Sequence, residues 1–187
     1  MKRYIFKNLI IGSTVLLSLA SCSDILEEKP HDFYEPGYFK TEQGVKQGLT
    51  SHYAHLRWIY GQAYFYNACQ TGTDEATYAQ SADGNFKDHD LSGVGIINPN
   101  SSRSDVLWNN SYYDINTASG IIENGAAVGV ASSLIAESKF FRGFDYFLLV
   151  QTFGGVPLDL GAGELKFNSK PSRYSKRNTV PEVYTKA

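Results

Sequence analysis

Two arrangements of polar side chains in the sequence could support chemistry, and neither makes a complete site. Acidic pairs occur at positions 74–75 and at Asp88 and Asp90, but glycosidic hydrolysis needs two carboxylates that face each other across the bond, and nothing here specifies such a pair. His52 and His55 lie one turn apart on an expected helix and could bind a metal ion, but no third ligand is evident. We therefore predict no catalytic residues, no metal, no cofactor and a protein that is not an enzyme.

The composition excludes two further classes of protein. The chain has 187 residues, of which 14% are aromatic, and a formal net charge of −2. A mostly disordered chain has few aromatic residues and a high net charge, so we expect a folded domain. A protein that binds nucleic acid carries a basic patch, and the charge balance offers none.

The first segment predicts export and lipidation. Lys2, Arg3 and Lys7 precede an apolar run at Leu9–Ala20, which is too short to cross a bilayer and fits the core of a signal peptide. The run ends in LASC, with Cys22 last, which resembles the bacterial lipobox. We therefore expect a signal peptide at residues 1–21 and an acylated Cys22 that anchors the chain to membrane lipid. The alternatives are an ordinary signal peptide with a chance cysteine, or a weak membrane anchor.

Residues 22–40 have no hydrophobic period and include several acidic residues, two prolines and a glycine, so they predict an extended tether that runs from the lipid. Acidic residues directly after a lipidated cysteine resemble the signal that sends some lipoproteins of Bacteroidetes to the cell surface. The alternative is a spacer that is merely soluble.

Three later segments have helical spacing. Thr41 can cap a helix over 41–66, Gly125 can end a helix over 108–124, and Ser132 or Ser133 can cap a helix that runs to about residue 153, where glycine and proline follow. The last two helices are joined by a short connection and should form an antiparallel hairpin. Five helical aromatic residues are expected in the core on spacing: Trp58, Trp108, Tyr112, Phe140 and Phe147.

The two remaining segments differ in character. Residues 70–105 are rich in Ser, Asp, Gly and Asn, and a loop of this length inside a compact domain is usually functional or disordered. At the other end, Thr179 is a good cap, with Pro181 and Glu182 in the first helical turn, but the sequence stops at Ala187. So short a helix is marginal alone, and we expect the chain to be the front part of a longer protein.

Residues 136–158 carry a resemblance to a known family. The segments AESKFFRGF at 136–144, YFLLV at 146–150 and FGGVPL at 153–158 resemble the signature stretch of the SusD/RagB family. The chain departs from the family at Gly143, where alanine is usual, and at Gly155, where aspartate is more frequent. The match covers the mature chain loosely and this stretch specifically.

The resemblance implies a fold and a setting. Members are surface-exposed outer-membrane lipoproteins of gut and oral Bacteroidetes that bind glycans, or in some branches peptides. They sit on a partner β-barrel that imports nutrients through TonB. The implied fold is mainly α, with tetratricopeptide-like helical hairpins and long irregular loops, here truncated, so that 41–187 would be the N-terminal part of a SusD-like helical domain.

The resemblance also directs attention to the polar loop. Sugar rings stack on exposed aromatic rings, and their hydroxyls bond to short carboxylates and amides. The loop carries both kinds, and we expect its glycan-binding residues to be Asp74, Tyr78, Asp83, Asn85 and Phe86. The alternative for the two rings is that they only pin the loop to the helices.

The expected function is a cell-surface lipoprotein that binds glycan and delivers it to a SusC-like TonB-dependent transporter of the outer membrane. One alternative is a helical interaction module that braces the transporter, with ligand contacts in a part beyond this sequence. A surface hydrolase is a third reading.

Overall fold

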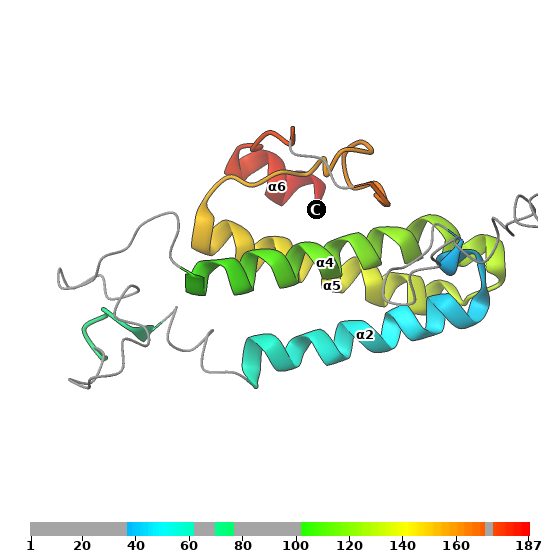
Figure 1. Cartoon of the computed structure of the whole chain (residues 1–187), viewed down its shortest axis with the longest axis horizontal. Helices are drawn as coiled ribbons and strands as arrows, with labels where there is room; N and C mark the ends of the chain where they lie inside the picture. Colours follow the sequence, from blue (N-terminus) through cyan, green and yellow to red (C-terminus); the bar gives the residue numbers. More distant parts are fainter. Residues whose placement is uncertain (1–36, 62–69, 77–101, 171–173) are drawn as a thin grey trace, which may run out of the picture. The chain divides into compact units, whose positions relative to one another are not determined.

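The computed structural model describes residues 37–61, 70–76, 102–170 and 174–187. The described chain is mainly helical, as the sequence predicts, with α2 at Glu42–Tyr60, α4 at Ser102–Asn124, α5 at Ser132–Phe153, α6 at Val180–Lys186, and 3-10 turns at Tyr38–Lys40 (η2) and Gly125–Val128 (η4). Within these residues the only extended pairings are isolated bridges, Thr71 with Ala76 and Asp159 with Glu164. Helices α2, α4 and α5 lie side by side, and successive helices run in opposite directions (Figure 1).

Helix α2 begins where the sequence predicts. The Thr41 hydroxyl accepts a hydrogen bond from the Gly44 amide at 3.0 Å and caps the helix. Two glycines weaken the helical propensity of α2, and the packing explains both. A Cβ at Gly44 would collide with the Tyr38 carbonyl oxygen. A Cβ at Gly48 would lie 2.9 Å from both Ile121 of α4 and the Phe39 ring, so glycine lets α2 approach α4 closely.

Helices α4 and α5 form the predicted antiparallel hairpin, with two differences at its ends. Helix α4 begins at Ser102, earlier than expected. The predicted serine cap of α5 is wrong, because Ala131 occupies the N-cap position and no side chain caps the helix. At the other end Gly154 has φ +73°, and its amide bonds to Val150 O at 2.9 Å, so glycine ends α5 as predicted.

The apolar core has two parts. One cluster joins α4, α5 and α6, and its buried members are Ile115, Tyr146, Leu149, Val150, Val156, Leu158 and Val183. The other cluster surrounds the start of α2, with buried members Phe39, Val45, Leu49, Ile121 and Val130. Because Phe39 is fully buried, the packed part of the chain already includes the end of the segment predicted as a tether.

Helix α6 is docked by its own cap and by one buried residue. Thr179 and Glu182 form a reciprocal capping box: Thr179 Oγ1 accepts from the Glu182 amide, and the Glu182 carboxylate accepts from the Thr179 amide at 2.7 Å. Val183 is fully buried against α5. The predicted helix start is therefore confirmed, and α6 belongs to the core.

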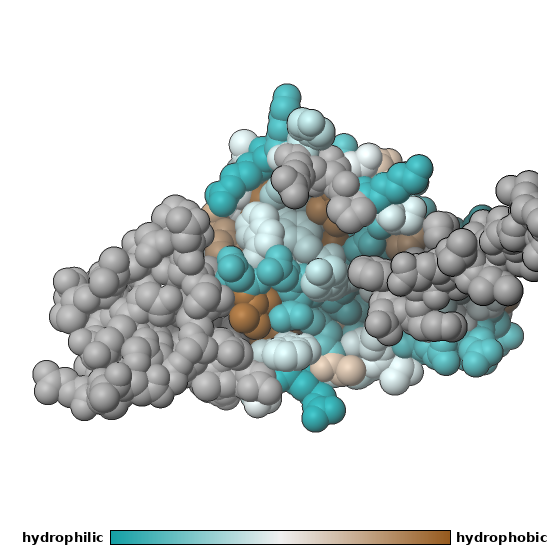
Figure 2. Space-filling model, in the orientation of Figure 1, coloured by the Kyte–Doolittle hydropathy of each residue, from teal (hydrophilic) through white to brown (hydrophobic). Residues whose placement is uncertain are grey.

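The predicted aromatic core is only partly confirmed. Trp108 and Tyr112 pack against the cluster around Ile115. Trp58, Phe140 and Phe147 were expected in the core, and that prediction is wrong, since they are 49%, 67% and 43% exposed. In the view of Figure 2 the described surface is mostly hydrophilic, with separate hydrophobic patches between polar residues. No described helix is both long enough and apolar enough to span a membrane.

Candidate functional site

A cluster of polar side chains lies buried where α2, α4 and α5 meet. Its members come from all three helices and are called here the His–Asp cluster: His52, His55, Asp114, Ser138 and Asp145. All five belong to the buried polar residues of the described chain. The two histidines are one turn apart on α2 and therefore share a helix face, while one aspartate comes from each of the other two helices.

One half of the cluster is centred on His52. His52 Nδ1 lies 2.8 Å from Asp114 Oδ1, and His52 Nε2 lies 3.2 Å from Ser138 Oγ. Because a carboxylate only accepts hydrogen bonds, Nδ1 carries a proton and donates it to Asp114, while Nε2 shares a hydrogen bond with the hydroxyl of Ser138. The Phe141 ring stacks on His52 at a centroid distance of 5.1 Å. The His52 ring is therefore held on both edges and on one face.

This connectivity is that of a Ser-His-Asp triad, but the placement excludes its chemistry. Ser138 is fully buried within α5, so no substrate carbonyl can approach its oxygen in this fold. A nucleophilic serine must be exposed to the bond it attacks. The three residues therefore connect the helices and do not form a serine-nucleophile active site.

The other half of the cluster joins His55 to Asp145. His55 Nε2 lies 2.9 Å from Asp145 Oδ1. Burial, together with the neighbouring Asp114, raises the pKa of Asp145 to about 7, although the hydrogen bond and charge of His55 lower it in part. Burial lowers the pKa of His55, but the hydrogen bond and charge of Asp145 outweigh that effect, so the pKa is raised. The pKa of each group therefore depends on its partner: His55 lowers that of Asp145, and Asp145 raises that of His55.

Two carboxylate oxygens of the cluster have no hydrogen-bond partner. Asp114 Oδ2 and Asp145 Oδ2 are buried and unsatisfied, as is Ser111 Oγ on α4. One ligand atom each of His55, Asp114 and Asp145 lies within 4.8 Å of the others. The sequence offered two histidines without a third ligand, and the fold brings two carboxylates to them. Such an arrangement can hold either a shared proton or a cation.

The outward sides of α2 and α5 carry a second feature, a set of aromatic rings called here the outer aromatic face: Tyr53, Tyr60, Phe140, Phe144 and Phe147. The exposed fractions are 55% for Tyr53 and 52% for Tyr60. Phe144 stacks between Tyr60, at 6.4 Å, and Phe140, at 6.3 Å. The rings therefore bridge the two helices on their solvent side.

Only one of the five predicted glycan-binding residues lies within the described part of the chain. Asp74 is exposed in a short turn, in which the Gly72 amide bonds to Ala76 O at 2.8 Å and the Thr73 hydroxyl to Gln70 O at 2.8 Å. Four others, Tyr78, Asp83, Asn85 and Phe86, lie outside the described residues, as does Cys22.

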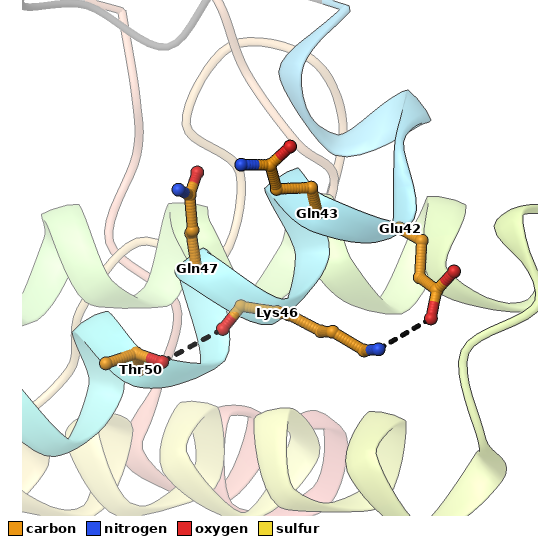
Figure 3. A pocket seen from close by; sticks show the side chains of 5 residues that line it. All are labelled: Glu42, Gln43, Lys46, Gln47 and Thr50. Carbon is orange, nitrogen blue, oxygen red and sulfur yellow. Dashed lines mark hydrogen bonds and ion pairs between the residues drawn. The ribbon is translucent and has the colours of Figure 1, made fainter.

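A polar hollow lies along the first half of α2, lined by Glu42, Gln43, Lys46, Gln47 and Thr50 (Figure 3). Lys46 Nζ reaches Glu42 at 2.6 Å, and the Thr50 hydroxyl bonds to Lys46 O at 3.1 Å. Tyr38 OH donates to Gln47 at 2.6 Å. Because all the lining residues come from one helix, the hollow has no opposing wall, and we assign it no ligand.

The match to a family model decides where the chain belongs. Residues 24–187 match a SusD-like model described as starch-binding and associating with the outer membrane. This chain is a member of the SusD-like family. The matched range includes every helix that the structure describes, so it covers both the outer aromatic face and the His–Asp cluster.

Two curated relatives support the same assignment. SusD-like protein P38 of Formosa agariphila is 30% identical over 184 residues, which cover 95% of this chain and 35% of the relative. SusD-like protein P2 of the same organism is 27% identical over 164 residues, which cover 84% of this chain and 31% of the relative. The chain thus spans about a third of the length of these relatives.

Sequence reasoning missed the His–Asp cluster, although one signal was present. Asp145 stands in the middle of an apolar helical run, between Phe144 and Tyr146. An acidic residue on the buried side of a helix needs a partner, and the histidine pair on the first helix was the available one. The distance from position 55 to position 145 hid the pairing, because only the fold brings the two together.

Proposed function

We propose that this SusD-like chain is part of a cell-surface lipoprotein that binds glycan and delivers it to a SusC-like TonB-dependent transporter. The observation that carries the proposal is the match of residues 24–187 to a family described as starch-binding and associating with the outer membrane. Acylated Cys22 would anchor the chain to the lipid of the outer membrane, with the helical domain facing the cell exterior.

We place the glycan site in the loop between α2 and α4. Those two helices are antiparallel neighbours, so the end of α2 and the start of α4 lie at the same end of the helix layer (Figure 1). In the proposal Tyr78 and Phe86 provide stacking surfaces, and Asp74, Asp83 and Asn85 bond to sugar hydroxyls. The exposure of Asp74 supports its role.

Affinity electrophoresis of the purified protein in gels that contain starch and other polysaccharides tests this site. We expect retardation of the wild type, and the Tyr78→Ala/Phe86→Ala double variant should bind at least about tenfold more weakly, as for two central contacts. Tyr113→Ala removes an exposed ring elsewhere on α4 and should migrate as the wild type does. Absence of retardation across the whole panel would remove the glycan proposal.

The lipid anchor has its own test. In the native host, Cys22→Ala should abolish incorporation of radiolabelled fatty acid and release the protein from the outer-membrane fraction. Protease added to intact cells should degrade the wild-type domain if it faces outward. Retention of the label in the Cys22→Ala variant would contradict lipidation at this residue.

The outer aromatic face favours a second candidate, the helical interaction module. Exposed aromatic groups on adjacent helices form the kind of surface that packs against another protein part. In this reading the SusC-like transporter covers the face and ligand contacts lie elsewhere. Co-purification with the transporter distinguishes the two candidates. Phe140→Gln/Phe147→Gln should weaken capture of the transporter and leave starch retardation unchanged, whereas the loop variant should do the reverse.

A further inference from the structure

We propose that the His–Asp cluster binds one divalent transition-metal ion, of which Zn²⁺ is the preferred example, through His55, Asp114 and Asp145. The proposal goes beyond glycan binding and departs from the sequence-based expectation of no metal. It begins from the convergence of one ligand atom from each residue within 4.8 Å of the others. Atoms that bind one zinc at about 2.0–2.2 Å, with tetrahedral or trigonal angles, lie roughly 3.3–3.8 Å apart. The ligand atoms therefore need to close by roughly 1–1.5 Å at most, which small side-chain rotations can supply.

The unsatisfied oxygens point to a bound cation. Asp114 Oδ2 and Asp145 Oδ2 are buried without any hydrogen-bond partner, and a buried carboxylate oxygen in that state is costly. Two adjacent carboxylates also repel each other in a site that water does not reach. A divalent cation between them removes both costs, because it is a ligand for the free oxygens and balances the two negative charges.

The remaining members of the cluster have the geometry of supporting residues. His52 holds Asp114 through its other oxygen, Oδ1, at 2.8 Å and leaves Oδ2 available. Ser138 in turn holds His52 at 3.2 Å. Partners of this kind orient metal ligands and are typical of metal sites in proteins. Ser111 lies three residues before Asp114, on the same side of α4, and its hydroxyl is also without a partner.

The donor set selects the class of metal. One imidazole nitrogen and two carboxylate oxygens suit Zn²⁺ and its transition-metal neighbours, whereas Ca²⁺ and Mg²⁺ prefer sites made of oxygen alone. The ligands come from α2, α4 and α5, so the ion would join the three helices. Because the cluster is buried, the role of the ion is structural.

The test uses the purified full chain, stripped of metal with a chelator and returned to buffer. We expect one equivalent of Zn²⁺ per chain by elemental analysis. At a free zinc concentration about 100-fold above Kd, we expect a rise in Tm of roughly 5–10 °C. Co²⁺ should bind in its place and give visible d–d absorption, which is absent from the metal-free protein. No bound metal, together with the same Tm in zinc and in chelator, would overturn the proposal.

Two variants on α5 distinguish a residue that binds the metal from one that only supports a metal ligand. Asp145→Asn keeps the size of the side chain and a partner for His55 but removes one charge. It should lose the zinc-dependent rise in Tm, and in chelator it should melt above the wild type because the carboxylate repulsion is gone. Ser138→Ala is equally buried and should keep one zinc per chain. Zinc binding by Asp145→Asn equal to that of the wild type would also overturn the assignment.

Discussion

The inner side of helix α5 carries polar side chains among its apolar core residues, and its outer side carries exposed aromatic rings. Toward α2 and α4 the helix presents Ser138 and Asp145, both fully buried, while Phe140 and Phe147 on the other side are 67% and 43% exposed. Helix α2 repeats this pattern, with His52 and His55 inside and Tyr53 and Tyr60 outside. An ordinary surface helix places its apolar stripe inward and its charges outward.

The comparison teaches that partners, and not polarity alone, decide which face is buried. Each buried charge or imidazole on the inner side has a partner on another helix, at 2.8 Å for His52 with Asp114 and 2.9 Å for His55 with Asp145. Hydrogen-bonded partners are the condition under which polar groups can be buried. The outer rings have neighbours among themselves and leave part of their apolar surface exposed.

The largest expected effect on stability comes from removing the carboxylate that pairs with His52. Asp114→Ala leaves the buried His52 Nδ1–H without an acceptor and should lower the free energy of unfolding by up to about 3 kcal/mol. Denaturation with urea, followed by circular dichroism, measures the change. Asn109→Ala on the exposed side of the same helix is the control and should change it by less than about 0.5 kcal/mol. A loss below about 1 kcal/mol for Asp114→Ala would show that the pairing contributes little.

A second substitution tests whether the packed side of α4 accepts added side-chain volume. A Cβ at Gly120 would collide with the Phe39 ring, so Gly120→Ala should destabilise by about 1–3 kcal/mol. At Gly143 a Cβ meets no atom within 4 Å. Gly143→Ala should therefore stabilise α5 by about 0.4–1 kcal/mol, through helix propensity and a less flexible unfolded chain. The Tm values of the two variants should lie on opposite sides of the wild type.

The elements of the fold could be predicted because their signals are local. The Thr41 cap, the Gly154 end of α5 and the Thr179 start of α6 each depend on a few adjacent residues, and each is present. The exposure of Phe140 could not be predicted in this way. Helical spacing reports which residues share a face, but which face is buried depends on the partner helices.

The two candidate sites differ in the same way: one was predicted from a local segment of the sequence, and the other depends on contacts between distant residues. The glycan-binding loop was predicted from composition and resemblance, and of its five residues only Asp74 falls within the described chain. The His–Asp cluster depends on contacts between positions far apart in the sequence, such as 52 with 138. No local pattern specifies such a pair, so its ligand set emerges only from the packed helices.

Helix α6 follows the ordinary pattern, with an aliphatic residue buried. We expect a substitution in it to have an effect of intermediate size on stability. Its one buried residue is the aliphatic Val183, and the aromatic Tyr184 is exposed. Thr179→Ala removes half of the capping box and should destabilise the docked helix by about 1 kcal/mol. Hydrogen exchange of the amides in 180–186 should speed up accordingly, while exchange in α4 stays as it is. Equal acceleration in both helices would mean that α6 does not open by itself.

Acid should loosen the same helix. The hydrogen bond from the Thr179 amide lowers the pKa of Glu182, and the Thr179 hydroxyl lowers it further. A lowered pKa means that the stabilisation is complete above the pKa of the unfolded chain and is lost as pH falls through that of the folded chain. The protection factors of the α6 amides, which correct for the intrinsic pH dependence of exchange, should therefore fall in the acid range more than those of α4. Glu182→Gln should remove most of this pH dependence.

The smallest effect on stability is expected on the outer side, from Phe140→Gln. Two thirds of this side chain is already in water, at 67% exposed, and its ring neighbours lie at 5.6 and 6.3 Å between centroids. Little apolar surface is uncovered by the change, so the free energy of unfolding should fall by about 0.5 kcal/mol or less. Urea denaturation of this variant beside Leu149→Gln, a fully buried position on α5, gives the contrast. A loss near that of Leu149→Gln would mean that Phe140 is packed in the native protein and that the two sides of α5 are both interior. A negligible loss, combined with weaker binding of the transporter, would make the outer rings a surface kept for recognition and leave the inner polar groups to hold the helices together.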